Sequence, residues 1–396
     1  MKKKTNWQEK KTSLGNAIII AAVAAIIGLI IGVSGNSWFA KFAPYLGFTA
    51  AANNDWSALD EVYNSLTASY DGEIDKAKVI EGAKKGLVES LGDVYTVYMN
   101  SEETSAFNND LHGNVGSGVG IEMGLRDGYV RVLRTLPDNP ARKAGVLAGD
   151  IIYKVNGEEV YALSTDEIAT KVRGETGSEV TITVVRDGKE LSFAMKRETI
   201  NNVSAYVDYD GSTAIVTVTR FDTDTGTMVQ NFTKEFAGKG ISKVILDLRD
   251  NGGGYVSAAQ DLLSLWLDGE TVLVQKSLHY GNSTTKSFTG KAILKDMKTI
   301  VLVNGSTASA SEITAGALQD YKKATIVGEK TYGKGVVQGL YNLSGGASIK
   351  ITTASWYTPL DRSINGTGIT PDVVVERTYE DINTMKDPQL DKAKEM

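Results

Sequence analysis

The sequence predicts a multidomain α/β protein that carries one membrane-spanning helix near its N-terminus. The chain has 396 residues, which exceeds the usual size of a single domain. Residues 17–33 (AIIIAAVAAIIGLIIGV) form an uninterrupted run without charge. Between residues 203 and 376, apolar strand-like segments such as KVILDLR and TIVLVNG alternate with helical ones such as SAAQDLLSLWL. This alternation is typical of an α/β domain.

The first part of the chain predicts a membrane anchor. Residues 1–13 are basic, with five lysines against one glutamate, and residues 14–37 hold the apolar run. About twenty apolar residues span the hydrocarbon core of a bilayer. Lysines before such a run predict a cytoplasmic N-terminus and an extracytoplasmic body. A cleaved signal peptide is the alternative, although the run is longer than a usual signal core and no clean A-x-A site follows it. Residues 38–54 are expected to be a linker.

Composition excludes several classes of function. The net charge of −6 implies no basic face, which argues against nucleic acid as a partner. The chain has no cysteine, so disulfides, thiolate chemistry and cysteine-based zinc sites are excluded. With only two histidines, a histidine-rich metal site is excluded as well. We therefore expect neither a metal nor a cofactor.

Four regions follow the linker. Residues 55–111 are expected to be helical, because LDEVYNSL and AKVIEGAKKGLVESL repeat apolar residues every three or four positions; these helices could pair two copies of the chain. Residues 112–198 change to strands and turns, with a hairpin expected around the D-G turn at 187–188. Residues 199–378 form the α/β region. The charged residues 379–396 are expected to be a peripheral helix.

Residues 139–150 (NPARKAGVLAGD) predict a short helix that Pro140 begins and Gly145 ends. This stretch resembles the signature of bacterial PDZ domains, which are β-rich with two helices. Upstream, GSGVGIEM resembles the PDZ carboxylate loop, whose successive backbone N–H groups can hold an anion. The resemblance implies that this loop binds the end of a peptide. A flexible turn is the alternative. The loop residues predicted to bind substrate are Gly116, Gly118, Val119, Gly120 and Ile121.

The run STASASE, residues 306–312, lies between an apolar strand and a predicted helix that begins at Ser311. A serine at such a junction can be a nucleophile beside converging helix N–H groups. The alternative is a helix cap, and Ser309 with Glu312 has the capping-box spacing. Lys334 follows in a G-K-G setting. If burial lowers the pKa of Lys334, its neutral amine could accept a serine proton without any histidine.

Several motifs together resemble the carboxyl-terminal processing peptidases, also called tail-specific proteases. They occur in the family's order after the PDZ-like region, and the resemblance covers residues 56–376. Where the family often has proline, this chain has Lys330, outside the catalytic positions. Many Gram-positive relatives continue into a peptidoglycan-binding domain, which we do not expect here because the chain stops at Met396. The matching stretches are LDLRDNGGG (246–254), NGSTASASEITAGALQD (304–320), VGEKTYGKGVVQ (327–338) and INGTGITPDVVV (364–375).

The resemblance implies a serine endopeptidase with a Ser-Lys catalytic centre. Its nucleophile would be Ser309, its general base Lys334, and Gln338 would orient the lysine through a hydrogen bond. The oxyanion would be held by the backbone N–H groups of Ala310 and Gly254. The resemblance further implies protein substrates that are bound through their C-terminal tails and cleaved at or near them outside the cytoplasm, with the PDZ domain as a gate.

Four other motifs or residue groups could suggest a function, but each has a simpler explanation or receives no role. Residues 328–334 nearly match a phosphate-binding loop, but Gly335 stands where the Mg²⁺-binding hydroxyl belongs. The single D-T-G-T at 224–227 is better explained as a capped helix start than as half of an aspartic protease. Asp247, Arg249 and Asp250 suggest an ion pair and a turn rather than a metal site. His112 and His279 receive no role. A catalytically dead PDZ scaffold is disfavoured because Ser309, Lys334 and Gln338 are all present.

Overall fold

A computed structural model describes residues 56–126, 128–200, 202–384 and 386–396. The chain divides into two compact units, residues 1–79 and 80–396. The predicted anchor at 14–37 lies outside the described residues, so the structure does not test it. In the part of the chain that is described, no helix combines the length and the apolar character needed to cross a bilayer.

The region expected to be helical contains α2 (Ser57–Ser69), α3 (Lys76–Glu89) and α4 (Ser101–Leu111). It also contains a strand that the sequence did not predict, β1 (Val97–Met99), which pairs antiparallel with a long strand of the C-terminal half. Tyr98 and Met99 of this strand are buried. The helical expectation is therefore wrong for these residues, because pairing with a distant strand decided their conformation.

The middle region, residues 117–199, folds around a twisted antiparallel sheet with its own apolar core. The hairpin expected at residues 179–195 forms, and its strands pair without a register shift. Pro140 begins α5, and Gly145 caps it with φ 90°. Among the described strands, β3 pairs with β4 alone and therefore forms one edge of this sheet, and β8 forms the other. The elements are β2 (Ser117–Gly118), β3 (Ile121–Arg126), β4 (Tyr129–Thr135), α5 (Pro140–Ala144), β5 (Ile151–Val155), β6 (Glu158–Glu159), α6 (Thr165–Val172), β7 (Glu179–Arg186), β8 (Lys189–Lys196) and β9 (Glu198–Thr199).

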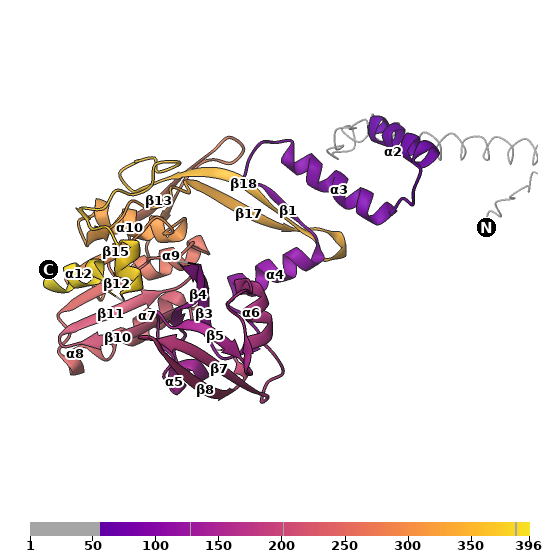
Figure 1. Cartoon of the computed structure of the whole chain (residues 1–396). Helices are drawn as coiled ribbons and strands as arrows, with labels where there is room; N and C mark the ends of the chain where they lie inside the picture. Colours follow the sequence, from indigo (N-terminus) through magenta and orange to yellow (C-terminus); the bar gives the residue numbers. More distant parts are fainter. Residues whose placement is uncertain (1–55, 127, 201, 385) are drawn as a thin grey trace, which may run out of the picture. The chain divides into compact units, whose positions relative to one another are not determined.

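The C-terminal half contains a six-stranded sheet in the order β10-β11-β12-β15-β16-β19. All neighbours run parallel except β10 and β11. A parallel sheet needs cover on both faces, and Figure 1 shows helices beside it on both sides. The elements are β10 (Ala205–Asp210), β11 (Thr213–Val218), α7 (Thr225–Thr233), α8 (Phe236–Lys239), β12 (Lys243–Asp247), α9 (Val256–Leu263), β15 (Lys298–Val303), α10 (Ala310–Asp320), β16 (Thr325–Gly328) and β19 (Val373–Val374).

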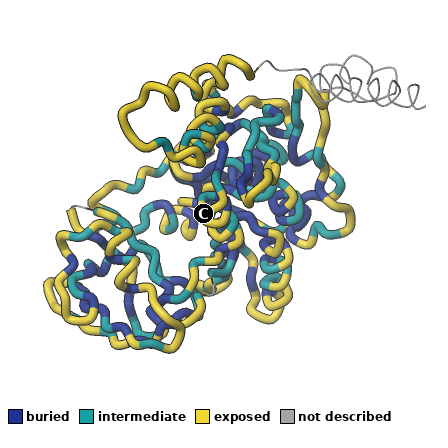
Figure 2. Tube along the Cα trace, turned by 90° about the vertical axis from the view of Figure 1, so that its right-hand side faces the viewer, coloured by how far each residue is buried: buried dark blue, intermediate teal, exposed yellow. Residues whose placement is uncertain are grey.

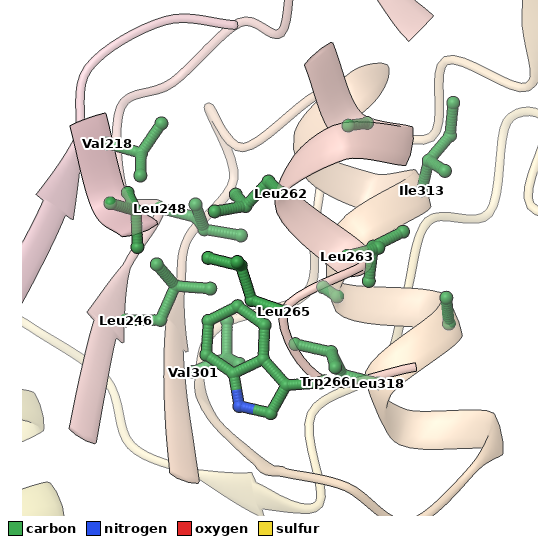
Figure 3. Close-up of a cluster of buried hydrophobic side chains, with 14 of the residues drawn as sticks. Val218, Leu246, Leu248, Leu262, Leu263, Leu265, Trp266, Val301, Ile313 and Leu318 are labelled. Carbon is green, nitrogen blue, oxygen red and sulfur yellow. The ribbon is translucent and has the colours of Figure 1, made fainter. Parts of the chain in front are cut away.

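The main core lies between this sheet and the helices α7, α9 and α10. Figure 3 shows Leu246 and Val301 from the sheet opposite Leu262, Leu263 and Trp266. The Trp266 indole is 1% exposed, and its Nε1 donates to Thr299 Oγ1 at 2.8 Å, so its polar atom is satisfied. Figure 2 shows buried segments of the chain (dark blue) with exposed segments (yellow) around them. This packing holds the ends of the sheet strands, and the loops that follow them, in fixed positions.

A second sheet joins distant segments of the C-terminal half to β1. Its order is β1-β18-β13-β14, and β17 pairs with β18. Strand β18 therefore contacts both the N-terminal segment and the strand that follows Lys334. The members are β13 (Thr271–Ser277), β14 (Gly281–Lys286), β17 (Val336–Asn342) and β18 (Ser348–Tyr357), with the 3-10 turn η2 (Ser344–Gly346) between the last two.

The C-terminal segment forms two helices, α11 (Tyr379–Asn383) and α12 (Pro388–Glu395), rather than one. Helix α12 covers the second face of the parallel sheet, and Ala393 is fully buried there. Asp387 at its N-terminus also pairs with Arg249 at 2.7 Å. The expected peripheral helix is thus a covering layer of the core.

Candidate active site

Ser309 lies at the junction between β15 and α10, where the chain leaves the sheet and turns into the helix. Its backbone has φ 56° and ψ −117°, a strained conformation for a residue with a side chain. Gly253 packs against it so closely that a Cβ there would lie 2.8 Å from Ser309 Cβ. The glycine turn and the serine junction therefore fit together only with glycine at position 253.

Glu312, one turn into α10, is fully buried and connects the serine junction with the lysine loop. Its carboxylate accepts from the backbone N–H of Ser309 at 2.9 Å, as the capping-box spacing suggested. It also accepts from the N–H groups of Gly333 at 2.7 Å and Lys334 at 2.9 Å, and from Thr331 Oγ1 at 2.6 Å. One carboxylate thus positions both candidate catalytic residues. The same bonds occupy N–H groups that a phosphate-binding loop would need.

Lys334 is partly buried, and its carbonyl accepts from Trp356 Nε1 at 2.9 Å. Burial is the main cause that lowers the pKa of Lys334, and the like charge of Lys350 lowers it further, while Glu312 acts in the opposite direction. The Nζ lies 5.5 Å from the centre of the Tyr95 ring. Among the described residues, no hydrogen bond or ion pair holds this Nζ. Burial and a like charge thus both favour the neutral amine of Lys334, which is the form in which a lysine can act as a base.

Gln338 lies on β17, which β18 separates from β1. We expected its side chain to form a hydrogen bond with Lys334, but the structure shows a different partner. Its Nε2 donates to the carbonyl of Tyr95, and within the described chain no hydrogen bond joins Gln338 to Lys334 Nζ. The expected orienting contact is therefore absent from this conformation. Tyr95 instead contacts both side chains, one with its ring and the other with its carbonyl.

The turn at residues 251–254 lies beside the serine junction. Asn251 is fully buried, and its carbonyl accepts from Ala308 N at 3.0 Å and Ser311 Oγ at 2.9 Å. Its side chain accepts from Gly253 N at 2.9 Å. In the described part of the molecule, the N–H groups of Gly254 and Ala310 make no hydrogen bond. Both N–H groups predicted to hold the oxyanion thus remain available.

A cavity of about 870 Å³ brings the candidate residues together. Ser309, Lys334, Gln338 and Gly254 line it. The same cavity is lined by Gly118, Val119, Gly120 and Ile121 of the predicted carboxylate loop, whereas Gly116 and Ala310 do not line it. It also reaches Ala169, Val172 and Arg173 at the end of α6, next to the open edge strand β3. The edge strand predicted to bind a peptide and the candidate catalytic centre therefore share one cavity.

Comparison with known proteins identifies the family. The model for peptidase family S41 matches residues 212–375, that for the PDZ domain matches residues 131–186, and that for the activating protease CtpB N-terminal domain matches residues 46–104. A probable CtpA-like serine protease of Staphylococcus aureus (strain COL) is 32% identical over 384 residues, covering 96% of this chain and 75% of that protein. The corresponding protein of Staphylococcus saprophyticus is 31% identical over 370 residues, covering 93% of this chain and 74% of the relative.

The chain belongs to peptidase family S41. Among solved structures, the photosystem II D1 C-terminal processing protease is 27% identical with a TM-score of 0.51, covering 83% of this chain and 88% of that one. A putative S41 protease from Bacteroides fragilis shares the fold, with a TM-score of 0.56 at 17% identity, covering 78% of this chain and 88% of that one. The resemblance to carboxyl-terminal processing peptidases is thereby confirmed. The protein is a serine peptidase of family S41 with a PDZ domain.

The other candidate motifs have structural explanations. Arg249 and Asp247 form the expected ion pair, at 2.7 Å. In the described residues, no group of three or more potential ligands could hold a metal ion. Asp224 precedes α7 as expected, but its side chain makes no capping bond; the Thr225 hydroxyl instead accepts from Asp222 N at 2.9 Å. His112 Nε2 lies 3.5 Å from the Tyr255 hydroxyl. In the sequence, His112 is far from Ser309.

Sequence reasoning missed four residues of this S41 site: Tyr95, Arg220, Lys350 and the full role of Glu312. Glu312 had a local signal, because it is the only acidic side chain within the first ten residues of helix α10. The other three had none. Arg220 and Lys350 line the cavity, and Tyr95 contacts Lys334 and Gln338. Strand pairing and packing between distant segments bring these residues there, and a local sequence pattern does not contain such contacts.

Proposed function

We propose that this S41 peptidase is an endopeptidase that uses Ser309 as nucleophile and Lys334 as general base to cleave extracytoplasmic proteins at or near their C-terminal tails. One observation carries the proposal. A lysine with a lowered pKa and no ion-pair partner among the described residues lines the same cavity as a serine in a strained turn, and Glu312 holds both loops. Strained backbone and perturbed titration are common at catalytic sites.

In the proposed reaction, neutral Lys334 accepts the Ser309 Oγ proton while Oγ attacks the scissile carbonyl carbon. The carbonyl oxygen becomes an oxyanion that the N–H groups of Ala310 and Gly254 stabilise. Protonated Lys334 then donates its proton to the leaving amine, which breaks the C–N bond and leaves an ester on Ser309. Water, deprotonated by the same lysine, hydrolyses this ester and restores the serine. The Gln338 amide would orient the lysine after its side chain turns from Tyr95.

The PDZ domain is proposed to bind the substrate tail. The open edge of β3 can accept an extended peptide as an additional strand, and the loop at residues 116–121 precedes that edge. Because this groove and the catalytic candidates line one cavity, occupancy of the groove is proposed to gate access to Ser309. Replacing Ala169 with tryptophan would fill the groove beside α6. Tail-dependent cleavage should then fall, and unchanged cleavage would argue against the gate.

The location and assembly of the enzyme are proposed from its N-terminal part. Residues 14–37 would anchor it with the catalytic body outside the cytoplasm, as the lysines before the apolar run indicate.

Helix α2 has no buried residue, and it exposes Leu59, Val62 and Leu66 along one side. We propose that this apolar side pairs with a second copy. Val62→Asp should shift the full chain from dimer to monomer in light scattering, and an unchanged mass would exclude this interface.

The experiment that tests the catalytic proposal is cleavage of a partly unfolded protein with an apolar C-terminal tail by the full chain in detergent. Ser309→Ala and Lys334→Ala should each abolish cleavage. Ser306→Ala and Lys330→Ala are matched controls, because both residues are exposed in the same two segments, and they should cleave like wild type. Circular dichroism checks that every variant is folded. If Ser309→Ala cleaves as well as wild type, the nucleophile lies elsewhere.

A further inference from the structure

Lys350 lies on β18 and directs its side chain toward the candidate catalytic cavity. Side chains alternate between the two faces of a strand. The preceding residue, Ile349, packs against the apolar cluster that contains Val88 and Tyr98 on one face of the sheet. Lys350 therefore takes the opposite face, where it lines the cavity and keeps part of its surface accessible. A molecule that enters the cavity can reach this lysine.

The ammonium of Lys350 has no anionic partner within the described structure. Its Nζ lies 5.3 Å from the centre of the Phe107 ring and makes no ion pair or hydrogen bond with the described residues. Burial lowers the pKa of Lys350, and no described carboxylate opposes this effect. Of the acidic residues on the cavity wall, Glu122 pairs with Arg134, and Asp110 forms no ion pair with Lys350. A partly buried cation without an acid beside it favours binding of an anionic group.

Two apolar side chains lie next to the ammonium. Leu340 is the direct partner of Lys350 in the register of β17 and β18, and Phe107 comes from α4. Both line the cavity. Glutamate combines a short apolar stem with a charged end, so its methylene groups can contact Leu340 and Phe107 while its carboxylate reaches Lys350 Nζ. The wall thus suits an acidic side chain better than a small inorganic anion.

The register of β17 and β18 places this part of the wall close to the candidate catalytic residues. Gln338 pairs with Thr352. Leu340 pairs with Lys350, two residues further along β17, which is about 7 Å in an extended strand. The charge of Lys350 also acts on Lys334. A side chain bound at Lys350 therefore belongs to the part of a substrate near the scissile bond, not to the tail in the PDZ groove.

We propose that Lys350, Phe107 and Leu340 form a substrate subsite that binds a glutamate side chain near the scissile bond. The inference rests on the proposed function, which brings a polypeptide into this cavity. It names a preference for the sequence at the cleavage point, separate from recognition of the tail by the PDZ domain. The Lys350 ammonium donates a charge-assisted hydrogen bond to the glutamate carboxylate, and such bonds are stronger than those between neutral groups.

Binding can be measured without cleavage in the full-length Ser309→Ala chain. The probes are fluorescent peptides that share one apolar C-terminal tail and carry either glutamate or glutamine, moved stepwise along the segment before the tail. Anisotropy gives the affinity of each peptide. At one position the glutamate peptide should bind about tenfold more tightly than its glutamine version, as expected for a charge-assisted contact.

Substitutions of Lys350 in this chain assign the preference to the subsite. Lys350→Met should bring the glutamate-to-glutamine ratio close to one while leaving the affinity of the glutamine peptide nearly unchanged. Lys350→Arg keeps the charge and should retain the ratio. Lys276→Met is the matched control, because it removes a lysine from β13 of the same sheet, outside the cavity wall, and it should not change the ratio.

Each other outcome overturns the proposal. If glutamate is preferred at no position, the subsite does not exist. If the preference survives Lys350→Met, another cation binds the glutamate. If Lys350→Met weakens both peptides equally, Lys350 has only a structural role. If it changes only the ratio between peptides with a free and an amidated C-terminus, the ligand is the terminal carboxylate. Should Lys350→Met unfold in circular dichroism, Lys350→Gln carries the same comparison.

Because binding is measured with Ser309→Ala, the result depends neither on catalysis nor on the effect of Lys350 on the general base. Failure of the proposed function would appear as cleavage that survives Ser309→Ala or Lys334→Ala. Failure of the subsite would appear only in the glutamate-to-glutamine ratio.

Discussion

Lys350 is a second partly buried lysine on the wall of the candidate catalytic cavity. It lies on β18, and its Nζ is 5.3 Å from the centre of the Phe107 ring. Burial lowers the pKa of Lys350 itself. Its charge is the second cause of the lowered pKa of Lys334, after burial. Lys350 therefore acts on the proposed base by electrostatics and without a direct bond.

Removing this charge should weaken Lys334 as a base at neutral pH. In Lys350→Met, the pKa of Lys334 is expected to rise, since a like charge no longer opposes its protonation. The neutral amine then forms only at higher pH, so the rising limb of kcat/KM against pH should move in the alkaline direction. Lys350→Arg keeps the charge and should leave the limb in place. A Met variant with an unmoved limb would exclude this electrostatic role.

Glu312 offers a second test at the residue scale. Its buried carboxylate accepts four hydrogen bonds, and a glutamine amide cannot accept at its nitrogen. Glu312→Gln should therefore leave buried donors unsatisfied, lowering the free energy of unfolding by about 1–3 kcal/mol. Cleavage should be lost as well, since both catalytic loops depend on this group. Denaturant unfolding and a cleavage assay measure the two effects, with Glu329→Gln, outside the cavity wall, as control.

At the scale of elements, the segment at residues 93–99 contacts two candidate catalytic residues, Lys334 and Gln338, although it precedes the PDZ domain in the chain. Asp93 accepts from Tyr95 N at 3.0 Å and from Thr96 Oγ1 at 2.6 Å. Thr96 Oγ1 in turn accepts from Thr352 N on β18 at 3.0 Å. These bonds, together with the β1–β18 pairing, hold the Tyr95 ring near Lys334 and its carbonyl at Gln338.

Tyr95→Ala should admit water to Lys334. Since burial is the main cause of the lowered pKa of Lys334, that pKa is expected to rise and activity at pH 7 to fall by about tenfold per unit. The loss should recover at alkaline pH. Tyr95→Phe keeps the ring and should behave like wild type. A limb that moves to lower pH in Tyr95→Ala would instead mean that attraction between the ring and the ammonium outweighs burial.

At the scale of the whole molecule, the chain combines an apolar N-terminal run, a PDZ domain and a peptidase core. The absence of cysteine makes its membrane orientation easy to test. Thr5→Cys and Asn64→Cys introduce single thiols on the two sides of the predicted anchor. In intact cells, a membrane-impermeant maleimide should label Asn64→Cys at once and Thr5→Cys only after lysis, because lysines before an apolar run predict a cytoplasmic N-terminus. The reverse pattern, or equal labelling, would contradict the proposed orientation.

The sequence by itself determined the family, the α/β class, the PDZ signature and the candidate pair Ser309 and Lys334. Those features are local: motifs, turn residues and apolar periodicity are read from neighbours in the chain. Tertiary structure alone decided that residues 97–99 form a strand, that α12 covers the core, and that Tyr95, Arg220 and Lys350 share the cavity with Ser309 or contact its lysine. Each of these depends on strand pairing or packing between residues far apart in the chain, and no short pattern records such contacts.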